Sequence, residues 1–362
     1  ASPSRTTVME FMDPANVNIC YTRLSTLLGH EYHGIPVVNG VVDIAVLKNA
    51  FSSLHTMYSD RQVTDSRPES SVVEYISTSG IEDVPLSITV LTMNRVESLR
   101  RLLTSLENAE YGHDRVHLVI RVDHATKNGA VVALAKSFDF SHGEKTVHVA
   151  TSNNGLRQSW FDAWHPATDE SRGIILEDDV EVSPKWYAWL KAAWKTYGDR
   201  DDLAGISLQR QTLVPKNPSK QMEIVNEHVP FLYALVGSIG FSPHPKQWTA
   251  FLHWVATADL DHVSTPGLVT SDWYAQLDKR HMWTQAFIYF CKSHDLYTLY
   301  TNLPHKKTLG AHHREKGEHY GKTEGPDFAL AQGVALDFPT ELVKYGWDGE
   351  RREVRLGGKS KV

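Results

Sequence analysis

The chain has 362 residues, which corresponds to about two domains, or to one large α/β unit with extensions, at roughly 150 residues per domain. With 41% hydrophobic and 22% charged residues, the composition excludes a disordered or fibrous protein. A formal net charge of -6 gives no sign of a basic surface for nucleic acid. The two cysteines, Cys20 and Cys291, are too few for a disulfide framework.

The sequence carries little sign of membrane association. No uninterrupted apolar stretch approaches the roughly 20 residues that cross a bilayer. The first residue is Ala1 rather than Met, which is consistent with removal of an N-terminal anchor or leader. No N-glycosylation sequon is present, because Asn217 is followed by Pro218, and this argues weakly against a lumenal location.

Residues 1–84 carry no interpretable chemical motif. They contain an apolar stretch at 37–47 and a polar one at 64–71, and we interpret them as an accessory layer or stem. At the other end, residues 339–362 are expected to form a C-terminal tail.

Strands and helices are predicted to alternate from residue 86 onwards. Leu86–Leu91 is a β-branched run of strand length, and the leucines after it recur at helical spacing. Ser183 and Pro184 are predicted to be the N-cap and first residue of a helix that buries an aromatic stripe and ends at Gly198. The elements predicted between these are strands at 117–122, 146–150 and 173–176, and helices at 99–106, 131–138 and 157–164.

This alternation predicts an α/β fold with a mostly parallel sheet flanked by helices, because parallel strands need crossover helices. Ligands of such sheets bind beyond the carboxyl ends of the strands. Arg95, Asp123 and the run Glu177-Asp178-Asp179 each follow a different predicted strand. We therefore expect these polar side chains to meet at one edge of the sheet.

The three adjacent carboxylates of residues 177–179 predict a cation site. Neighbouring carboxylates repel one another, so a cation or hydrogen bonds must compensate when they stand beside a core strand. Mg²⁺ and Mn²⁺ prefer oxygen ligands and often share their coordination shell with phosphate. The alternative is an acidic turn exposed to solvent, which is how we interpret Asp201-Asp202.

Two later segments carry further candidates. Asp272 stands before two aromatic residues that could wall a pocket, a setting that suits a general base, and a helix N-cap is its alternative role. The segment Leu309–Gly321 combines glycines, histidines and cations, as expected of a loop that meets a metal-bound diphosphate. A surface histidine cluster is the alternative there, and a zinc site is disfavoured because no cysteine is close in sequence.

These motifs resemble glycosyltransferases of the GT-A fold, and most closely the N-acetylglucosaminyltransferase I type and related uncharacterised proteins of plants and protists. Ile174–Pro184 is similar to the metal motif of that family and the helix after it. Leu91–Arg95 is similar to its first nucleotide-binding strand, and Arg121–Asp123 to the strand that contacts uracil. Ser271–Trp273 is similar to the segment with the catalytic base, and His312–Gly321 to a C-terminal loop that folds over the donor.

The resemblance implies a GT-A, Rossmann-like domain after an N-terminal extension, with a nucleotide-sugar-binding half at 85–200 and an acceptor-binding half at 201–338. It implies Asp272 as the catalytic base. The metal would be bound by Asp179 with His313 and His319. The residues expected to contact the nucleotide sugar are Arg95, Asp123, Arg157, Glu177, Asp178, Arg314 and Lys316.

The predicted function is therefore metal-dependent transfer of a sugar from a UDP-sugar, with Mn²⁺ or Mg²⁺, to a hydroxyl of a glycan or glycoprotein. A divalent ion on Asp179 would stabilise the departing diphosphate, and a single displacement would invert the anomeric centre. We expect no nucleic-acid partner, and membrane contact only through an anchor absent from this chain. The expected location is the Golgi lumen if an anchor was removed, and otherwise the cytoplasm.

Three alternatives stay open at the level of sequence. A sugar-nucleotide pyrophosphorylase would share the layout, but it should carry a Gly-rich loop with Arg and Lys where this chain has Leu91–Glu97. A carbohydrate-binding protein on a degenerate scaffold is disfavoured by the presence of Asp179 and Asp272. A two-metal hydrolase would want His-x-Asp spacing, which the adjacent pairs His113-Asp114 and Asp261-His262 do not provide.

Overall fold

The computed structural model describes residues 37–38, 41–42, 86–276, 282–315, 322–336 and 338–352. The chain divides into two units, Ala1–Thr78 and Ser79–Val362. In the first unit the described residues form strands β1 (Val37–Val38) and β2 (Val41–Val42), which pair antiparallel. The rest of the predicted accessory region lies outside the described residues, as do residues 353–362 of the predicted tail.

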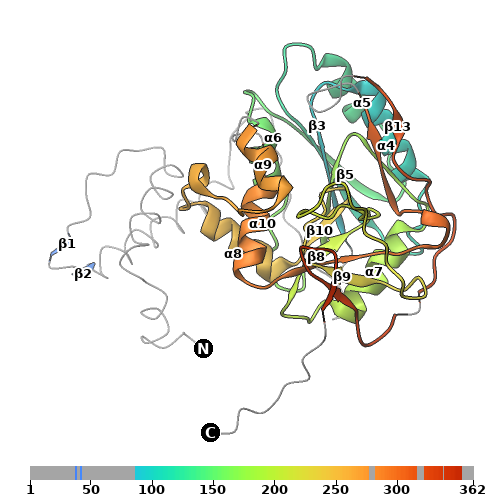
Figure 1. The fold of residues 1–362 in the computed structure, drawn as a ribbon. Coiled ribbons are helices and arrows are strands. Elements are labelled where there is room, and N and C mark those ends of the chain that lie inside the picture. Colours follow the sequence, from blue (N-terminus) through green and yellow to red (C-terminus); the bar gives the residue numbers. More distant parts are fainter. Residues whose placement is uncertain are drawn as a thin grey trace, which may run out of the picture. The chain divides into compact units, whose positions relative to one another are not determined.

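The second unit is organised around a large sheet with helices packed against it (Figure 1). This sheet has ten strands in the order β15-β14-β9-β11-β8-β10-β6-β3-β4-β5. The four strands at the β5 end, joined in the order β6-β3-β4-β5, are all parallel. Beyond β6 the sheet is mixed, with parallel pairs β8–β11 and β9–β14 among antiparallel ones. The strands are β3 (Ser87–Thr92), β4 (Val116–Val122), β5 (Gly143–Val149), β6 (Gly173–Glu177), β8 (Leu203–Ser207), β9 (Phe231–Tyr233), β10 (Phe241–Pro243), β11 (Tyr297–Tyr300), β14 (Lys344–Tyr345) and β15 (Arg351–Arg352).

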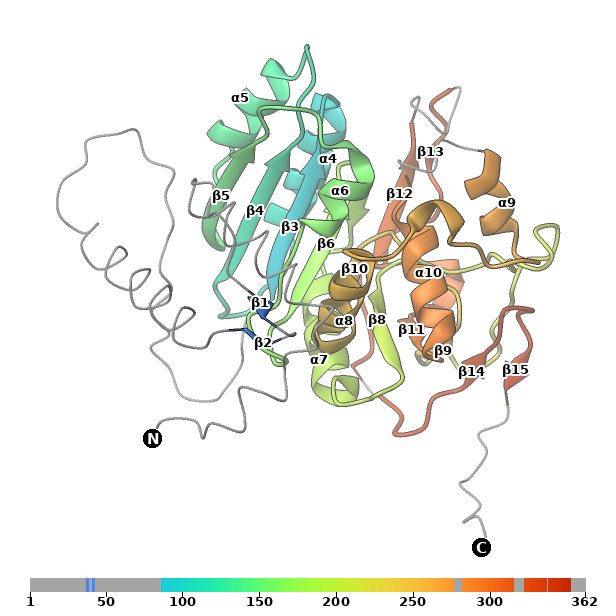
Figure 2. The same ribbon diagram turned by 90° about the vertical axis from the view of Figure 1, so that its left-hand side faces the viewer.

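Helices cover both faces of this sheet. One core cluster contains side chains of α4, α5 and α7, and the other contains side chains of α6, α8 and α10. Figure 2 shows α6, α8 and α10 in front of the sheet. The helices are α4 (Val96–Glu107), α5 (Gly129–Ser137), α6 (Gly155–Phe161), α7 (Trp186–Tyr197), α8 (Pro245–Val255), α9 (Val269–Gln276) and α10 (Thr284–Ser293), with single 3₁₀ turns at Leu260–His262 and Pro304–Lys306.

The central strands are buried on both faces, as expected of parallel strands between helices. In β6, Ile174 and Leu176 belong to the α4–α5–α7 cluster, whereas Ile175 between them belongs to the other. The same alternation holds in β3, where Val90 and Leu91 face opposite clusters. The predicted α/β class, with a mostly parallel sheet flanked by helices, is confirmed.

The start predicted for helix α7 is wrong by two residues. The helix begins at Trp186, with Lys185 rather than Ser183 at the N-cap position. The Ser183 hydroxyl instead donates a hydrogen bond to the Ala331 carbonyl while it accepts one from the Lys185 backbone N–H. The aromatic stripe and the cap at Gly198 lie where they were predicted, and the tryptophans of the helix are buried.

A small second sheet lies next to the carboxyl end of β6. Strand β7 (Val180–Val182) follows β6 after Asp178 and Asp179 and pairs antiparallel with β12 (Gly310–Arg314). Strand β12 also pairs with β13 (Gly325–Pro326). The late segment that begins at Gly310 therefore runs directly beside the acidic residues. None of the helices within the described residues has the length and apolarity needed to cross a bilayer.

Candidate functional site

The carboxyl ends of β3, β4 and β6 meet at one edge of the sheet, as the sequence predicted. Leu91 of β3 is aligned with Glu177 of β6, and Thr92 is aligned with Val122 of β4. The turns that follow these strands are tied to β3 by backbone hydrogen bonds: the Asp178 N–H donates to Leu91 O at 3.0 Å, and the Asp123 N–H donates to Thr92 O at 2.8 Å. The polar groups of three separate segments are thereby held next to one another.

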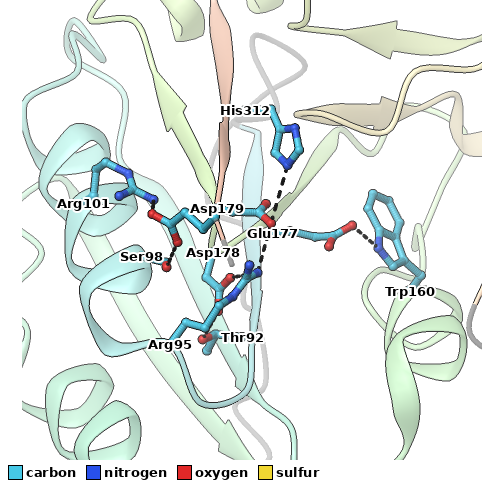
Figure 3. Close-up of polar contacts among 10 residues, drawn as sticks. Thr92, Arg95, Ser98, Arg101, Trp160, Glu177, Asp178, Asp179 and His312 are labelled. Atoms are coloured by element: carbon cyan, nitrogen blue, oxygen red, sulfur yellow. Dashed lines mark hydrogen bonds and ion pairs between the residues drawn. The ribbon is translucent and has the colours of Figure 1, made fainter. Parts of the chain in front are cut away.

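Arg95 lies between two of the three carboxylates (Figure 3). Its Nη2 donates hydrogen bonds to Oδ1 of Asp178 and, at 3.0 Å, to Oδ2 of Asp179. The Thr92 hydroxyl donates to the other oxygen of Asp178 at 2.7 Å. One arginine thus provides the counter-charge that adjacent carboxylates at a core edge require.

Asp178 is the most deeply buried member of the triplet, with 3% of its side chain exposed. Burial raises the pKa of this carboxyl to about 6, although the Arg95 charge and the Thr92 hydrogen bond act in the opposite direction. Asp178 thus has both carboxylate oxygens engaged by protein donors. Its role in the structure is to fix Arg95 and the turn after β6.

Asp179 faces a histidine from strand β12. The antiparallel pairing aligns His312 with Val180, and the His313 backbone N–H donates to Asp179 O at 2.8 Å. As a result, Nε2 of His312 lies 3.7 Å from Oδ2 of Asp179 (Figure 3). Burial opposes ionisation of Asp179, but His312 and Arg95 outweigh it and lower the pKa of Asp179. Burial also acts against protonation of His312, and the Asp179 carboxylate outweighs it and raises the pKa of His312.

Glu177 is the third acidic residue and points toward α6. Its Oε1 accepts a hydrogen bond from the indole Nε1 of Trp160 at 3.0 Å (Figure 3). Trp160 is fully buried and stacks on Trp283, with ring centroids 3.8 Å apart. Burial, followed by the charge of Asp179, raises the pKa of Glu177 to about 7. Burial therefore favours the protonated form of Glu177 more than that of an exposed glutamate.

The other predicted ligands of the late segment are placed differently. The His313 side chain contacts Glu181, with His313 Nε2 and Glu181 Oε2 2.6 Å apart, and no described contact joins its imidazole to the Asp179 carboxylate. Arg314 pairs with Glu324 at 3.1 Å across the β12–β13 ladder. Lys316 and His319 lie outside the described residues.

Glu315, the residue directly after β12, is held against helix α4. Glu315 accepts a hydrogen bond from the Ser98 hydroxyl, and its other oxygen lies 2.7 Å from Nη2 of Arg101. The Glu315 pKa is lowered, because these two partners outweigh the effect of burial. The ion pair holds the end of β12 against the same helix that follows Arg95.

Asp123 binds the amino end of α6. Its carboxylate accepts backbone N–H bonds from His124 at 2.8 Å, Asn154 at 2.9 Å and Gly155 at 3.0 Å. A carboxylate has about four acceptor positions, so roughly one stays open. Arg157 lies in the first turn of the helix that Asp123 holds.

Asp272 lies apart from these contacts. It is exposed in the first turn of α9, and its backbone N–H donates to Leu268 O at 3.4 Å. Among the described residues, no hydrogen bond or ion pair links its carboxylate to the acidic residues. The structure thus brings together Arg95 and the 177–179 triplet, and the role of Asp272 stays a prediction.

Three residues of the site were not singled out from the sequence: Thr92, Trp160 and His312. Thr92 and Trp160 had no distinguishing signal, since a strand-end threonine and a buried helical tryptophan are ordinary. His312 stood in the predicted histidine segment, next to the chosen His313. Successive residues of a strand point to opposite faces, so the register of β12 decides which of the two faces Asp179.

The donor set suits a cation that is bound together with a ligand. Among the described residues, no group of three or more His, Cys, Asp or Glu side chains is arranged to hold a metal ion. Asp179 and His312 supply one carboxylate and one imidazole. Mg²⁺ is commonly held by one or two carboxylates plus substrate phosphates and water, rather than by a cage of protein ligands, and Mn²⁺ has similar ligand preferences. These residues fit that kind of shared site.

Comparisons with known proteins give partial matches. The family described as the SPBC1E8.03c C-terminal domain matches residues 94–260, less than half of the chain. This stretch contains Arg95, Asp123 and the acidic triplet. No curated protein matches the chain in sequence.

Among solved structures, TarS residues 1–349 from S. aureus is 11% identical with a TM-score of 0.37, covering 62% of this chain and 59% of that one. The same TarS fragment in complex with UDP is 9% identical with a TM-score of 0.36, again covering 62% and 59%. The mannosyltransferase PcManGT from Pyrobaculum calidifontis, in complex with GDP-Man and Mn²⁺, is 12% identical with a TM-score of 0.32, covering 57% of this chain and 56% of that one. The chain thus spans less than two thirds of these proteins, and TM-scores this low describe a partial overlap of architecture and say nothing about what this chain binds.

Proposed function

We propose that this chain is a metal-dependent glycosyltransferase that moves a sugar from a UDP-sugar to a hydroxyl of a glycan or glycoprotein. The observation that carries the proposal is the arrangement at the sheet edge, where Arg95 and the triplet 177–179 stand at the carboxyl ends of adjacent parallel strands. Nucleotides bind at this edge in open α/β sheets. The motif resemblance to GT-A enzymes of the N-acetylglucosaminyltransferase I type gives the same assignment.

We place the cation between Asp179 and the diphosphate of the donor. His312 is the better second ligand than His313, because His312 faces Asp179 and His313 is engaged by Glu181. A divalent ion held there would neutralise charge on the departing diphosphate as a Lewis acid. His319 lies outside the described residues and stays a candidate ligand.

The protein groups around this position suit a nucleotide sugar. Arg95 and Arg314 are candidate partners of the phosphate oxygens, because guanidinium groups bind phosphate through paired hydrogen bonds. Lys316 is a further candidate from the sequence. The open acceptor position of Asp123 suits the imide N–H of uracil. Arg157 in the first turn of α6, together with Glu177, would contact the ribose and sugar hydroxyls. Asp178, predicted from the sequence to do the same, has both oxygens engaged and would act by holding Arg95. The Trp160 bond orients Glu177 for that task.

Asp272 is proposed as the base that takes the proton of the acceptor hydroxyl. Its carboxylate is exposed, as an acceptor site requires. Direct attack of the activated hydroxyl on the anomeric carbon would invert the configuration. No step of this proposal needs a covalent sugar–protein intermediate.

The test is UDP release from a panel of UDP-sugars with Mn²⁺ and a mixture of glycan acceptors. Asp179→Asn should lower transfer by roughly 100-fold or more, because a group that stabilises the developing charge is weakened. The matched control is Asp201→Asn, which makes the same change at a carboxylate that is 92% exposed in another acidic pair, and it should leave transfer unchanged. Equal activity of both variants would overturn the assignment of Asp179.

Asp272→Asn tests the base separately. It should leave UDP binding by calorimetry intact while transfer falls by roughly 10²- to 10⁴-fold, the usual contribution of a general base. Full transfer by this variant would remove Asp272 from the role. Release of a sugar 1-phosphate in pyrophosphate would indicate a pyrophosphorylase instead. Sugar binding without any product would indicate a carbohydrate-binding protein.

A further inference from the structure

Only one nitrogen of the Arg95 guanidinium takes part in the described hydrogen bonds of this side chain. Both of its described hydrogen bonds start from Nη2, one to Asp178 and one to Asp179. A guanidinium group carries five N–H donors, and Nη2 has two of them. Among the described residues, Nε and Nη1 of Arg95 have no hydrogen-bond partner, and 32% of the side chain is exposed. The guanidinium therefore keeps an accessible edge with three donors for an anion.

The two partners of Arg95 are not equivalent. Asp178 is 3% exposed and is fixed on its other oxygen by Thr92. Asp179 is 16% exposed, and the oxygen that Arg95 binds, Oδ2, is also the one that lies 3.7 Å from His312. The contact with Asp178 is thus part of the buried framework, whereas the contact with Asp179 engages the oxygen that faces His312, the second ligand proposed for the cation.

We propose that Arg95 occupies Asp179 in the free protein and releases it when a nucleoside diphosphate binds, so that diphosphate and divalent cation bind cooperatively. This inference rests on the proposed function and adds an order of binding to it. Phosphate oxygens that bind the open edge of the guanidinium draw Nη2 away from Asp179, while Asp178 retains the side chain. The freed Oδ2 then becomes available to the cation.

Linkage makes the coupling reciprocal: if the diphosphate raises cation affinity by some factor, the cation raises diphosphate affinity by the same factor. Typical coupling factors between two sites are roughly 5- to 150-fold. In the free protein, by contrast, the cation must displace Arg95 unaided. Weak cation binding without nucleotide is therefore a property of this pair of residues.

The experiment is a calorimetric cycle on the full chain with Mn²⁺ alone, UDP alone in EDTA, and Mn²⁺ at saturating UDP, corrected for Mn²⁺–UDP association in solution. In Arg95→Gln, Mn²⁺ alone should bind at least about fivefold more tightly than in wild type, and the coupling factor should fall by a similar amount. UDP alone should bind more weakly. Arg100→Gln is the matched control, because Arg100 lies on α4, the helix that Arg95 precedes, with 54% of its side chain exposed, and it should change neither quantity.

Arg95→Lys separates displacement from a change of net charge. It keeps the charge but has a single ammonium in place of the fork, so Mn²⁺ affinity should lie between those of wild type and Arg95→Gln. Circular dichroism verifies that each variant is folded, and Arg95→Lys alone carries the test if Arg95→Gln does not fold.

Two results would overturn the inference: Mn²⁺ binding in Arg95→Gln no tighter than in Arg100→Gln, or a coupling factor that the Arg95 variants leave unchanged. The failure of the proposed function looks different. In that case wild-type protein binds no UDP even with Mn²⁺, whereas the Mn²⁺-only comparison still reports whether Arg95 competes for Asp179.

Discussion

The two halves of the large sheet are built differently. From β5 to β6 the strands are parallel, have five to seven residues and are joined by crossover helices, as in β3–α4–β4–α5–β5. From β10 to β15 most strands have two to four residues, antiparallel pairs are interspersed with parallel ones, and long irregular segments connect them. Arg95, the acidic triplet 177–179 and His312 all come from the parallel half of the sheet or from β12 beside it.

This difference shows where chemistry can be assembled from local sequence. In the parallel half, each strand delivers its next residues to the same edge, so neighbouring polar groups follow from the topology alone. In the mixed half, polar residues meet through distant pairs. Asn302, for example, is 5% exposed and donates to Ile224 O, 78 positions away. The first half organises a site, and the second half is held together by long-range contacts.

The substitution with the largest expected effect on stability tests whether the two halves of the sheet unfold together. The core cluster on the α8 face contains Leu91 and Ile175 of the parallel half together with Trp248 of α8. Trp248 is fully buried and donates from Nε1 to Trp164 O at 3.0 Å. Trp248→Ala should cost about 3–5 kcal/mol of unfolding free energy, because it leaves a large cavity and an unpaired carbonyl. Denaturant unfolding followed by tryptophan fluorescence measures it.

All ten tryptophans lie after residue 159, so this fluorescence reports only on the second unit. Trp254→Ala is the matched control, since Trp254 lies on the same helix but is only half-buried, and it should cost clearly less. A single transition is expected for both variants because the shared cluster couples the halves. Two separate fluorescence transitions in Trp248→Ala would show that the mixed half unfolds on its own.

The same contrast explains how much of the fold could be predicted. In the parallel half, strands that are buried on both faces have apolar runs such as Gly173–Leu176 in the sequence. The helix after β3 has leucines at helical spacing, so the sequence predicts it as well. Strand β5 was predicted to begin at Thr146, but it begins at Gly143. Its first residues are polar and show no strand pattern in the sequence, and they join the strand because Gly143 pairs with Val116. The short strands of the mixed half form through pairings between residues that are distant in sequence, such as Thr298 with Tyr233. No local sequence pattern predicts such pairings.

The candidate site likewise has one part that the sequence predicted and another that it did not. That Arg95 meets Asp178 and Asp179 followed from their positions at the ends of predicted parallel strands. That His312 rather than His313 faces Asp179 depends on the alignment of β12 with β7, and a shift of one residue would exchange the two. The predicted roles of Asp123, Arg157 and Asp272 depend on a ligand, so neither the sequence nor the fold alone decides them.

A smaller effect concerns the charges that hold the mixed half. The interpretation of Asp201-Asp202 as an exposed acidic turn holds for Asp201 but is wrong for Asp202, whose side chain is 25% exposed. Asp202, just before β8, accepts two hydrogen bonds of 2.9 Å from Arg200 and pairs with Lys344 of β14. Burial opposes its ionisation, but these two cations outweigh it and lower the pKa of Asp202 below its ordinary value of 3.8. A carboxylate with a lowered pKa in the folded state stabilises the protein above its unfolded pKa, and this stability is lost as the pH falls through the folded pKa.

Asp202→Asn should therefore cost about 1 kcal/mol at neutral pH and flatten the loss of stability below pH ~4. The measurement is urea unfolding from pH 7 down to the acid limit of the folded state, followed again by tryptophan fluorescence. Asp201→Asn makes the same change one residue earlier, where the side chain is 92% exposed and lies 3.3 Å from Lys246. Its stability curve should parallel that of wild type. If the two variants lose stability along the same curve at low pH, the Asp202 ion pairs do not hold β14 to the start of β8, and the mixed half depends on its core alone.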